Sequence, residues 1–327
     1  MGRIVILFLS LAMMVRAQHV IVFGIDGLSV GAFNRARIPR LHQMMRDAAW
    51  TLEARGVMPT LSSPNWASMM DGAGPEQHGI TSNGYLKPMQ ELQPVCRDED
   101  GIFPTIFHLL RAARPTANLA VFHDWPGFAN LVEKSAPDVM RHEHGPQKTV
   151  EAAIAYWREK RPELLFVQID NVDHAGHASG WLSRDYLREV EEADRLLGTV
   201  LDMVRDDPAA DSTYVLVSSD HGGKGRNHGK NSLEEIRIPW ILAGPDVAAR
   251  PLATSVYTFD TAATIAWILH VSPDACWIGR PVEAAFQPSA ITLRTAAGGQ
   301  CTDRGITAPA GVPTLAGPAA PHGEHHN

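Results

Sequence analysis

Five short apolar runs, rich in β-branched residues, constrain the fold of this chain more than any other feature of its 327 residues. They are VIVFGI (20–25), NLAVF (118–122), LLFVQI (164–169), TYVLVSS (213–219) and IPWILA (238–243). None alternates cleanly between apolar and polar residues, which is typical of strands buried on both faces. Helix-patterned stretches separate the runs. The sequence therefore predicts an α/β fold with a doubly wound, mainly parallel sheet flanked by helices.

The clearest helical pattern is DYLREVEEADRLLGTVLDMVRD, at 185–206. Its apolar residues recur at helical spacing: Leu187, Val190, Ala193, Leu197, Val200, Leu201 and Val204. Beyond about residue 287 the composition shifts to Ala, Pro, Gly and Thr. We therefore assign residues 18–287 to one folded domain and expect residues 288–327 to form a disordered tail.

Three of the apolar runs are followed or ended by an aspartate. These are Asp26, Asp170 and Asp220, and Asp173 follows Asp170 closely. In an open parallel sheet, ligands bind beyond the carboxyl ends of the strands, so we expect these carboxylates to gather at one edge. A single aspartate at a strand end is more often a helix cap, and the prediction depends on several occurring together.

Histidines accompany these aspartates. His177 lies four residues after Asp173, His221 adjoins Asp220, and His228 follows within GGKGRNHGKN. One loop histidine alone is usually solvated. Crowded carboxylates repel one another, however, and a divalent cation relieves that repulsion. Mixed imidazole and carboxylate ligands suit zinc best, with iron, manganese or cobalt as alternatives and calcium disfavoured.

The segment PTLSSPNWASMMDGAGPEQHGI (59–80) places two adjacent serines before a proline and a short apolar helix. One interpretation is capping, in which Ser62 or Ser63 accepts from the first helical turn and Pro64 takes the first helical position. The other is chemical, because a hydroxyl at a helix N-terminus lies in a field that favours anions. A metal at the same edge of the sheet can hold such a hydroxyl as an alkoxide.

These segments resemble the alkaline phosphatase superfamily, and within it the type I phosphodiesterase/nucleotide pyrophosphatase family. The resemblance runs from about Val20 to Pro281, through GIDG (24–27), PTLSSPNWASMMDGAGPEQHGITSN (59–83), DxxGH (173–177), SSDHGG (218–223), HG (228–229) and DTAATIAWIL…WIGRPV. It implies an alkaline phosphatase-like catalytic domain over 18–287 and a metal-dependent phosphohydrolase of the phosphodiesterase type.

The resemblance also implies roles for individual residues. One of two zinc ions would be held by Asp26, Asp220, His221 and the Ser62 oxygen, and the other by Asp173, His177 and His228. The family nucleophile, usually threonine, falls on Ser62, which would carry a covalent intermediate. A family asparagine that binds a phosphate oxygen falls on Asn83.

Two departures from the family leave the substrate open. The chain lacks the long insertions that shape substrate pockets in larger members. Serine in place of threonine keeps a phosphomonoesterase as an alternative, because monoesterases of the superfamily also use serine. In VFHDWPGF, the residues His123, Trp125 and Phe128 are either core residues or a pocket wall, and Trp125 is the candidate for substrate contact.

Two further alternatives share this fold. A sulfatase needs a modifiable residue at the first position of the SSPNW segment and arginine at the fifth, where this chain has Trp66. A noncatalytic metal-binding surface protein is disfavoured because the nucleophile and all the expected metal ligands are present.

Charge and the N-terminus bear on partners and location. The net charge is -7 and no block of Lys or Arg occurs, so we expect a small phosphate ester as substrate rather than a nucleic-acid polymer.

The N-terminal segment, MGRIVILFLSLAMMVRAQHV, has one early arginine, an apolar run from Ile4 to Val15, and Ala17 before a possible cleavage site. It predicts a signal peptide over 1–17, a periplasmic or secreted enzyme, and no membrane span after cleavage. A buried first strand is the alternative for this run.

The three cysteines are Cys96, Cys276 and Cys301. They are too few and too scattered for a zinc knuckle or a disulfide scaffold. In an oxidising compartment Cys276 and Cys301 can pair and leave Cys96 free, but three cysteines do not settle the pairing. The sequence also leaves the oligomeric state open.

Overall fold

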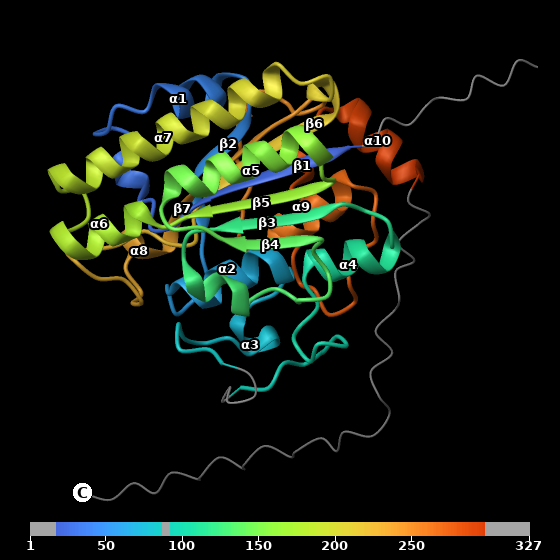
Figure 1. The fold of residues 1–327 in the computed structure, drawn as a ribbon, viewed down its shortest axis with the longest axis horizontal. Helices are drawn as coiled ribbons and strands as arrows, with labels where there is room; N and C mark the ends of the chain where they lie inside the picture. The colour runs from blue at the N-terminus through green and yellow to red at the C-terminus, as the bar shows by residue number, and fades with distance from the viewer. Residues whose placement is uncertain (1–17, 87–91, 298–327) are drawn as a thin grey trace, which may run out of the picture.

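One mixed sheet of eight strands forms the centre of the molecule (Figure 1). The computed structural model describes residues 18–86 and 92–297, so the predicted signal peptide and residues 298–327 lie outside the described residues. The strands are β1 (His19–Ile25), β2 (Ala49–Arg55), β3 (Leu119–His123), β4 (Val139–His142), β5 (Leu164–Ile169), β6 (Thr213–Ser218), β7 (Arg237–Ala243) and β8 (Arg250–Pro251).

The strand order is β4-β3-β5-β1-β6-β7-β2-β8. Neighbours from β4 to β6 pair in parallel, β7 is antiparallel to both β6 and β2, and β8 is parallel to β2. The prediction of a mainly parallel sheet is confirmed, and the five apolar runs are β1, β3, β5, β6 and β7. Strands β2, β4 and β8, whose residues are partly or fully exposed at several positions, were not predicted from the sequence.

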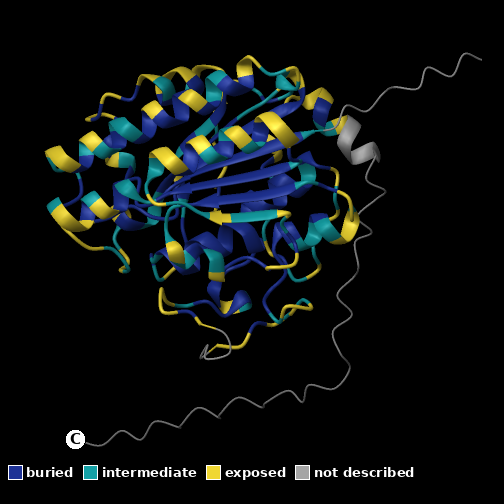
Figure 2. Cartoon of the chain, viewed as in Figure 1, coloured by how far each residue is buried: buried dark blue, intermediate teal, exposed yellow. Residues whose placement is uncertain are grey.

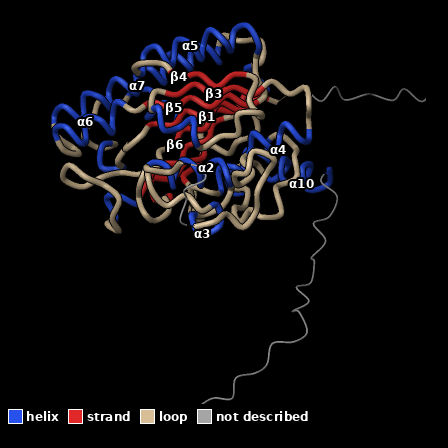
Figure 3. The backbone as a smooth tube through the Cα atoms, turned by 60° about the horizontal axis from the view of Figure 1, so that its bottom comes forward, coloured by secondary structure: helices blue, strands red, loops and turns tan. Residues whose placement is uncertain are grey.

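Helices cover both faces of the sheet. They are α1 (Pro39–Arg46), α2 (Ser62–Asp71), α3 (Pro75–His78), α4 (Ile106–Ala113), α5 (Pro146–Lys160), α6 (Asn171–Ser179), α7 (Arg184–Arg205), α8 (Leu233–Ile236), α9 (Asp260–Ile268) and α10 (Pro288–Ala297), with short 3-10 turns η1 (Val30–Ala32), η2 (Pro126–Asn130), η3 (Ala210–Ser212) and η4 (Glu283–Ala285). Figure 3 shows α5 and α7 on one side of the strands and α2, α3 and α4 on the other.

Each face of the sheet has its own hydrophobic core. Along β1, Ile21 and Phe23 pack into the core under α1, α5 and α7, whereas Val20 and Val22 pack into the core over α2, α4 and α9. All four side chains have no exposed surface, and the central strands are dark blue in Figure 2, whereas β4 is teal and yellow. Burial of both faces explains why the apolar runs do not alternate. Each such side chain contributes about 1.5–3 kcal/mol to folding.

Two predictions about helices have clear outcomes. The amphipathic pattern after residue 184 forms α7, with Val190, Ala193, Leu197, Val200 and Val204 buried and the other two apolar positions half-buried. Helix α10 occupies the first ten residues of the segment predicted as a tail. Because Ala290 packs into the core, the folded part of the chain extends beyond residue 287.

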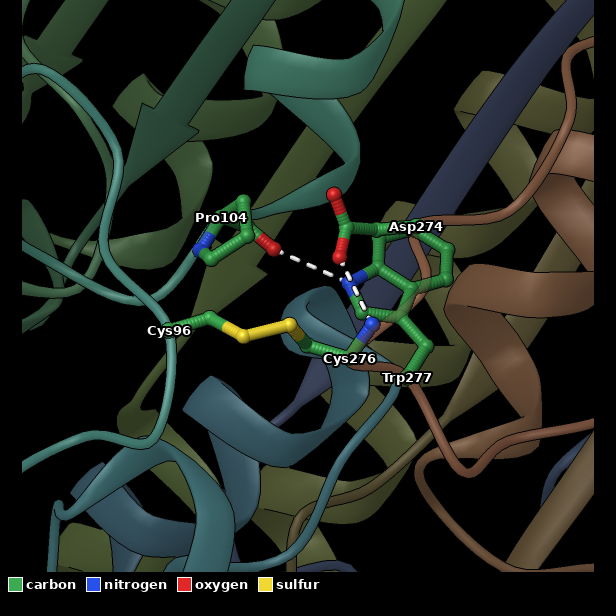
Figure 4. The surroundings of a disulfide bond; sticks show 5 residues. All are labelled: Cys96, Pro104, Asp274, Cys276 and Trp277. Carbon is green, nitrogen blue, oxygen red and sulfur yellow. Dashed lines mark hydrogen bonds between the residues drawn. A yellow bond between two sulfur atoms is a disulfide. The ribbon is translucent and has the colours of Figure 1, made fainter. Parts of the chain in front are cut away.

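A disulfide joins Cys96 to Cys276, across 180 residues of sequence (Figure 4). The alternative in which Cys276 pairs with Cys301 is therefore wrong, and Cys301 lies outside the described residues. The loop of Cys276 is held close to the loop of Cys96 by neighbouring contacts: Trp277 Nε1 donates to the Pro104 carbonyl at 3.0 Å. The positions of the cysteines in the sequence do not indicate that these two loops meet.

Across residues 18–86 and 92–297, no helix combines the length and apolar character needed to cross a bilayer.

Candidate metal centre and nucleophile

The carboxyl ends of three adjacent strands bring the predicted acidic residues together. Asp26 follows β1, Asp170 follows β5, and Asp220 lies two residues beyond the end of β6. Ligand atoms lie within 4.8 Å of one another in each of three groups: Asp26, Asp220 and His221; Asp173, His221 and His228; and Asp26, Asp170 and Asp173. The structure thus places all the predicted strand-end aspartates at one edge, as expected from the sheet topology.

Backbone carbonyls fix the orientation of the three histidines. Nδ1 of His177 lies 2.9 Å from the Arg226 carbonyl oxygen, Nδ1 of His221 lies 2.8 Å from that of Gly222, and Nδ1 of His228 lies 2.7 Å from that of Thr60. A carbonyl oxygen only accepts, so each Nδ1 carries the proton and donates it. In the neutral ring, Nε2 then presents a lone pair, which is the state that binds a metal.

The three Nε2 atoms face the carboxylates. His221 Nε2 lies 3.1 Å from Asp220 Oδ2 and 3.6 Å from Asp26 Oδ1. His177 Nε2 lies 3.4 Å from Asp173 Oδ2, the carboxylate that also faces His228.

His228 Nε2 lies only 3.1 Å from His177 Nε2. Because both Nδ1 atoms donate to carbonyls, two lone pairs face each other with no proton between them. A cation between these nitrogens removes that repulsion.

The acidic oxygens are also unsatisfied. Asp26 Oδ1, Asp173 Oδ1 and Asp220 Oδ2 are buried without a hydrogen-bond partner. Burial, followed by the charges of neighbouring carboxylates, raises the pKa of Asp26 well above its usual value and that of Asp173 to about 8. Burial also lowers the pKa of His221 to about 3 and that of His228 to about 4. Neutral imidazoles beside crowded carboxyl groups fit divalent transition metals, which displace the protons that crowding favours.

The opposite oxygens of the same carboxylates are held by hydrogen bonds. Asp26 Oδ2 accepts from Trp66 Nε1 at 2.9 Å and from Gln168 Nε2 at 3.2 Å, and Asp220 Oδ1 accepts from the Gly27 N–H at 3.1 Å. These bonds determine which oxygen faces the cluster. This role of Trp66 and Gln168 was not predicted from the sequence, although Gln168 is the one polar residue in the apolar run LLFVQI.

Ser62 begins α2, and its Oγ lies 3.3 Å from His221 Nε2. The capping interpretation is wrong: Leu61 occupies the N-cap position, no side-chain hydrogen bond is made from it, and Pro64 is the third helical residue. Instead, Asn83 Oδ1 accepts from the Ser63 N–H at 2.8 Å. This contact leaves the Asn83 amide NH₂ as a donor beside the helix N-terminus that carries Ser62.

The VFHDWPGF segment is largely core. His123 and Phe128 are 1% and 0% exposed, and their rings stack with centroids 5.8 Å apart. Trp125 is partly buried against the same core, and its backbone N–H donates to Gln168 Oε1 at 3.0 Å. The pocket-wall interpretation therefore fails for His123 and Phe128. A substrate contact of Trp125 remains a prediction.

A cavity of about 610 Å³ adjoins the acidic cluster on the side of β4 and α6. Asp170 belongs to both, since it lines the cavity and lies within 4.8 Å of Asp26 and Asp173. His142 and His174 also line it. The cavity offers room for a ligand group beside the cluster.

A family model described as type I phosphodiesterase/nucleotide pyrophosphatase matches residues 20–236. The chain belongs to this family. Ectonucleotide pyrophosphatase/phosphodiesterase family member 1 of Mus musculus is 22% identical over 259 residues, which cover 73% of this chain and 28% of the relative. Venom phosphodiesterase 2 of Crotalus adamanteus is 23% identical over 216 residues, which cover 62% of this chain and 26% of the relative. The chain thus spans about a quarter of the length of the curated relatives it matches.

Solved structures show the same fold. Murine ectonucleotide pyrophosphatase/phosphodiesterase 5 superposes with a TM-score of 0.70 at 15% identity, covering 83% of this chain and 100% of that one. A 2-O GAG sulfatase superposes with a TM-score of 0.66 at 15% identity, and the match covers 82% of this chain and 74% of the sulfatase. The alkaline phosphatase-like α/β fold predicted from the sequence is confirmed.

Proposed function

We propose that this chain is a phosphoric ester hydrolase of the phosphodiesterase type that uses Ser62 as nucleophile and two zinc ions. The observation that carries the proposal is the Ser62 hydroxyl at a helix N-terminus, 3.3 Å from His221 Nε2 and beside buried, unpartnered carboxylate oxygens. Asp26, Asp220, His221 and Ser62 would hold one ion, and Asp173, His177 and His228 the other. When bound, the ions would supply Lewis acidity and lower the pKa of the nucleophile.

The residues of the chain account for a two-step displacement. Ser62 Oγ, having given its proton to solvent, attacks phosphorus while the bond to the leaving alkoxide breaks, and that alkoxide takes a proton from solvent. The Asn83 amide donates to a non-bridging oxygen, where negative charge grows. Water then attacks phosphorus, the bond to Ser62 breaks, and the serine recovers its proton. The net reaction converts a diester and water into a monoester and an alcohol.

The test compares substrates and metal loading together. A bis-aryl phosphodiester, an aryl phosphomonoester and a nucleotide are assayed with zinc and after chelation; a nucleotide is included because a murine relative has been crystallised with AMP. We expect at least two metal equivalents per chain, loss of activity on chelation and preference for the diester. Faster turnover of the monoester would overturn the diesterase assignment. Full activity in excess chelator would overturn the metal mechanism.

Helix α6 offers a matched pair of variants. His177 faces Asp173 at 3.4 Å, whereas the side chain of His174, three residues earlier on the same helix, is 86% exposed. His177→Ala should lower metal content at one site, and His174→Ala should leave it at the wild-type level. Equal metal content in the two variants would remove His177 from the ligand set.

We also propose export, with cleavage after Ala17. The disulfide between Cys96 and Cys276 supports an oxidising compartment, because such bonds are rare in the cytosol. N-terminal sequencing of protein from an exporting host should begin near Gln18 or His19. A soluble cytoplasmic product that retains Met1 would contradict the proposal.

A further inference from the structure

A second cluster of metal-ligating side chains lies at the opposite end of α2 from Ser62. Asp71 is the last residue of this ten-residue helix, so about 15 Å separates the two ends. Near it, Asp98, His108 and Glu133 each offer a ligand atom, and these atoms lie within 4.8 Å of one another. The three residues come from a loop, the first turn of α4 and the segment after η2, so the chain converges here from separate elements.

Hydrogen bonds hold two of these carboxylates in place. Glu133 is 1% exposed, and Thr105 donates to it twice, from N–H to Oε1 at 2.8 Å and from Oγ1 to Oε2 at 2.6 Å. Asp98 Oδ1 accepts from the Ile102 N–H at 2.9 Å, while Asp98 Oδ2 is buried without a partner. Hydrogen bonds thus orient both carboxylates, and Asp98 Oδ2 is left as an acceptor without a donor.

Asp71 adds an independent observation. Its side chain is 2% exposed, and its Oδ1 is buried without a hydrogen-bond partner. Burial raises its pKa well above the usual value, and the charges of Glu133 and Asp98 raise it further, so its carboxyl group lies close to theirs. Within residues 18–86 and 92–297, no Lys or Arg forms an ion pair with Asp71, Asp98 or Glu133. Three carboxyl groups, those of the buried Asp71 and Glu133 and of the partly exposed Asp98, therefore lie together without an ion pair to Lys or Arg among the described residues.

We propose that Asp98, His108 and Glu133 bind a structural zinc ion, with the unpartnered Asp71 carboxylate beside it. Two carboxylates with one imidazole suit zinc or manganese, whereas calcium prefers a shell of oxygen atoms. The site takes no part in the ester chemistry proposed above. It ties the Asp98 loop, which begins at the disulfide of Cys96, to α4. The competing account is a metal-free carboxyl pair that shares a proton.

Metal content of matched variants separates the two accounts. His108→Ala removes a half-exposed ligand, Glu133→Gln removes a buried one, and Glu99→Gln is the control, because Glu99 adjoins Asp98 but is exposed and outside the cluster. Each protein is dialysed against zinc, desalted and analysed for metal. We expect the first two to hold about one equivalent less than wild type and the control to match wild type. If Glu133→Gln does not fold, His108→Ala decides the question.

Equal metal content in wild type and His108→Ala would overturn the structural site in favour of a shared proton. This failure is distinct from failure of the catalytic proposal, which predicts that His177→Ala loses metal whether or not the second cluster binds any. A crystal grown with zinc gives a second readout. Its anomalous map should show an ion bonded to Glu133 and His108 at about 2.0–2.2 Å; an empty position there, with ions at the catalytic edge, would overturn the proposal.

Discussion

Replacing Trp66 by phenylalanine removes one hydrogen bond to Asp26 and keeps most of the buried ring. The indole Nε1 donates to Asp26 Oδ2 at 2.9 Å, and this bond favours the charged carboxylate. Without it, only the longer bond from Gln168, at 3.2 Å, holds that oxygen. The carboxylate, whose free Oδ1 atom we assign to the metal, is then less firmly oriented and more readily protonated.

The size of the effect follows from the chemistry of this bond. A hydrogen bond to a charged group contributes about 1.5–3 kcal/mol. If most of this loss appears in metal binding, affinity falls about 10- to 100-fold, the range found when an outer-shell partner of a metal ligand is removed. The smaller ring also leaves a cavity, which costs on the order of 1–3 kcal/mol of unfolding free energy.

Trp157→Phe is the matched control for this cavity. Trp157 is 0% exposed like Trp66, and its Nε1 donates to Asp207 Oδ2 at 3.2 Å, but Asp207 pairs with Arg161 away from the cluster. Zinc affinity is measured by competition with a chromophoric chelator, and stability by thermal unfolding. We expect both variants to lose stability and Trp66→Phe alone to lose zinc affinity. Wild-type affinity in Trp66→Phe, or equal losses in both variants, would refute the reasoning.

Three further predictions concern the phosphate donor, the disulfide and the pH dependence. Asn83→Ala should raise the transition-state barrier by about 2–4 kcal/mol at unchanged metal content, and an unchanged turnover would leave Asn83 as a cap of α2 only. Cys96→Ser should lower the unfolding free energy by about 2–4 kcal/mol relative to wild type, measured with and without reductant. Equal stability of variant and wild type would contradict a stabilising disulfide. In chelated protein the pKa of Asp173 is raised to about 8, whereas those of His221 and His228 are lowered and give the opposite slope below about pH 6.5; stability should therefore fall as pH rises from about 6.5 to 8, and zinc should reduce this slope. Thermal unfolding that instead improves from pH 6.5 to 8 in chelator contradicts the assignment.

The sheet and its acidic edge were predictable because both depend on local patterns. Apolar runs predict the strands, and the carboxyl ends of parallel strands lie at one edge whatever the loops do, so Asp26 and Asp220 were expected at the same edge. Their close approach also depends on β1 and β6 being neighbours, which the structure shows. The edge strand β4 was missed because it is short and half-exposed, and β2 because its polar residues interrupt the apolar pattern. Such strands form because they pair with neighbouring strands, and their own sequences carry little strand pattern.

Contacts between distant loops were not predictable in this way. The pairing of Cys96 with Cys276 depends on two loops that meet only in the folded chain. The same is true of Asn83, which satisfies the helix N-terminus that the capping interpretation assigned to Ser62 or Ser63. In both cases the residue types suggested an interaction, and the partner came from tertiary structure.

The central claim is that Ser62 is the nucleophile, and it is tested most directly by comparing Ser62→Ala with Ser63→Ala at equal metal content. Of these two serines, Ser62 is the one whose hydroxyl contacts a proposed metal ligand, with Oγ 3.3 Å from His221 Nε2. Hydrolysis of a bis-aryl phosphodiester should fall by about a thousandfold or more in Ser62→Ala, as expected on removal of a nucleophile, and by less than about threefold in Ser63→Ala. An active Ser62→Ala enzyme, or a dead Ser63→Ala enzyme beside it, would contradict the claim.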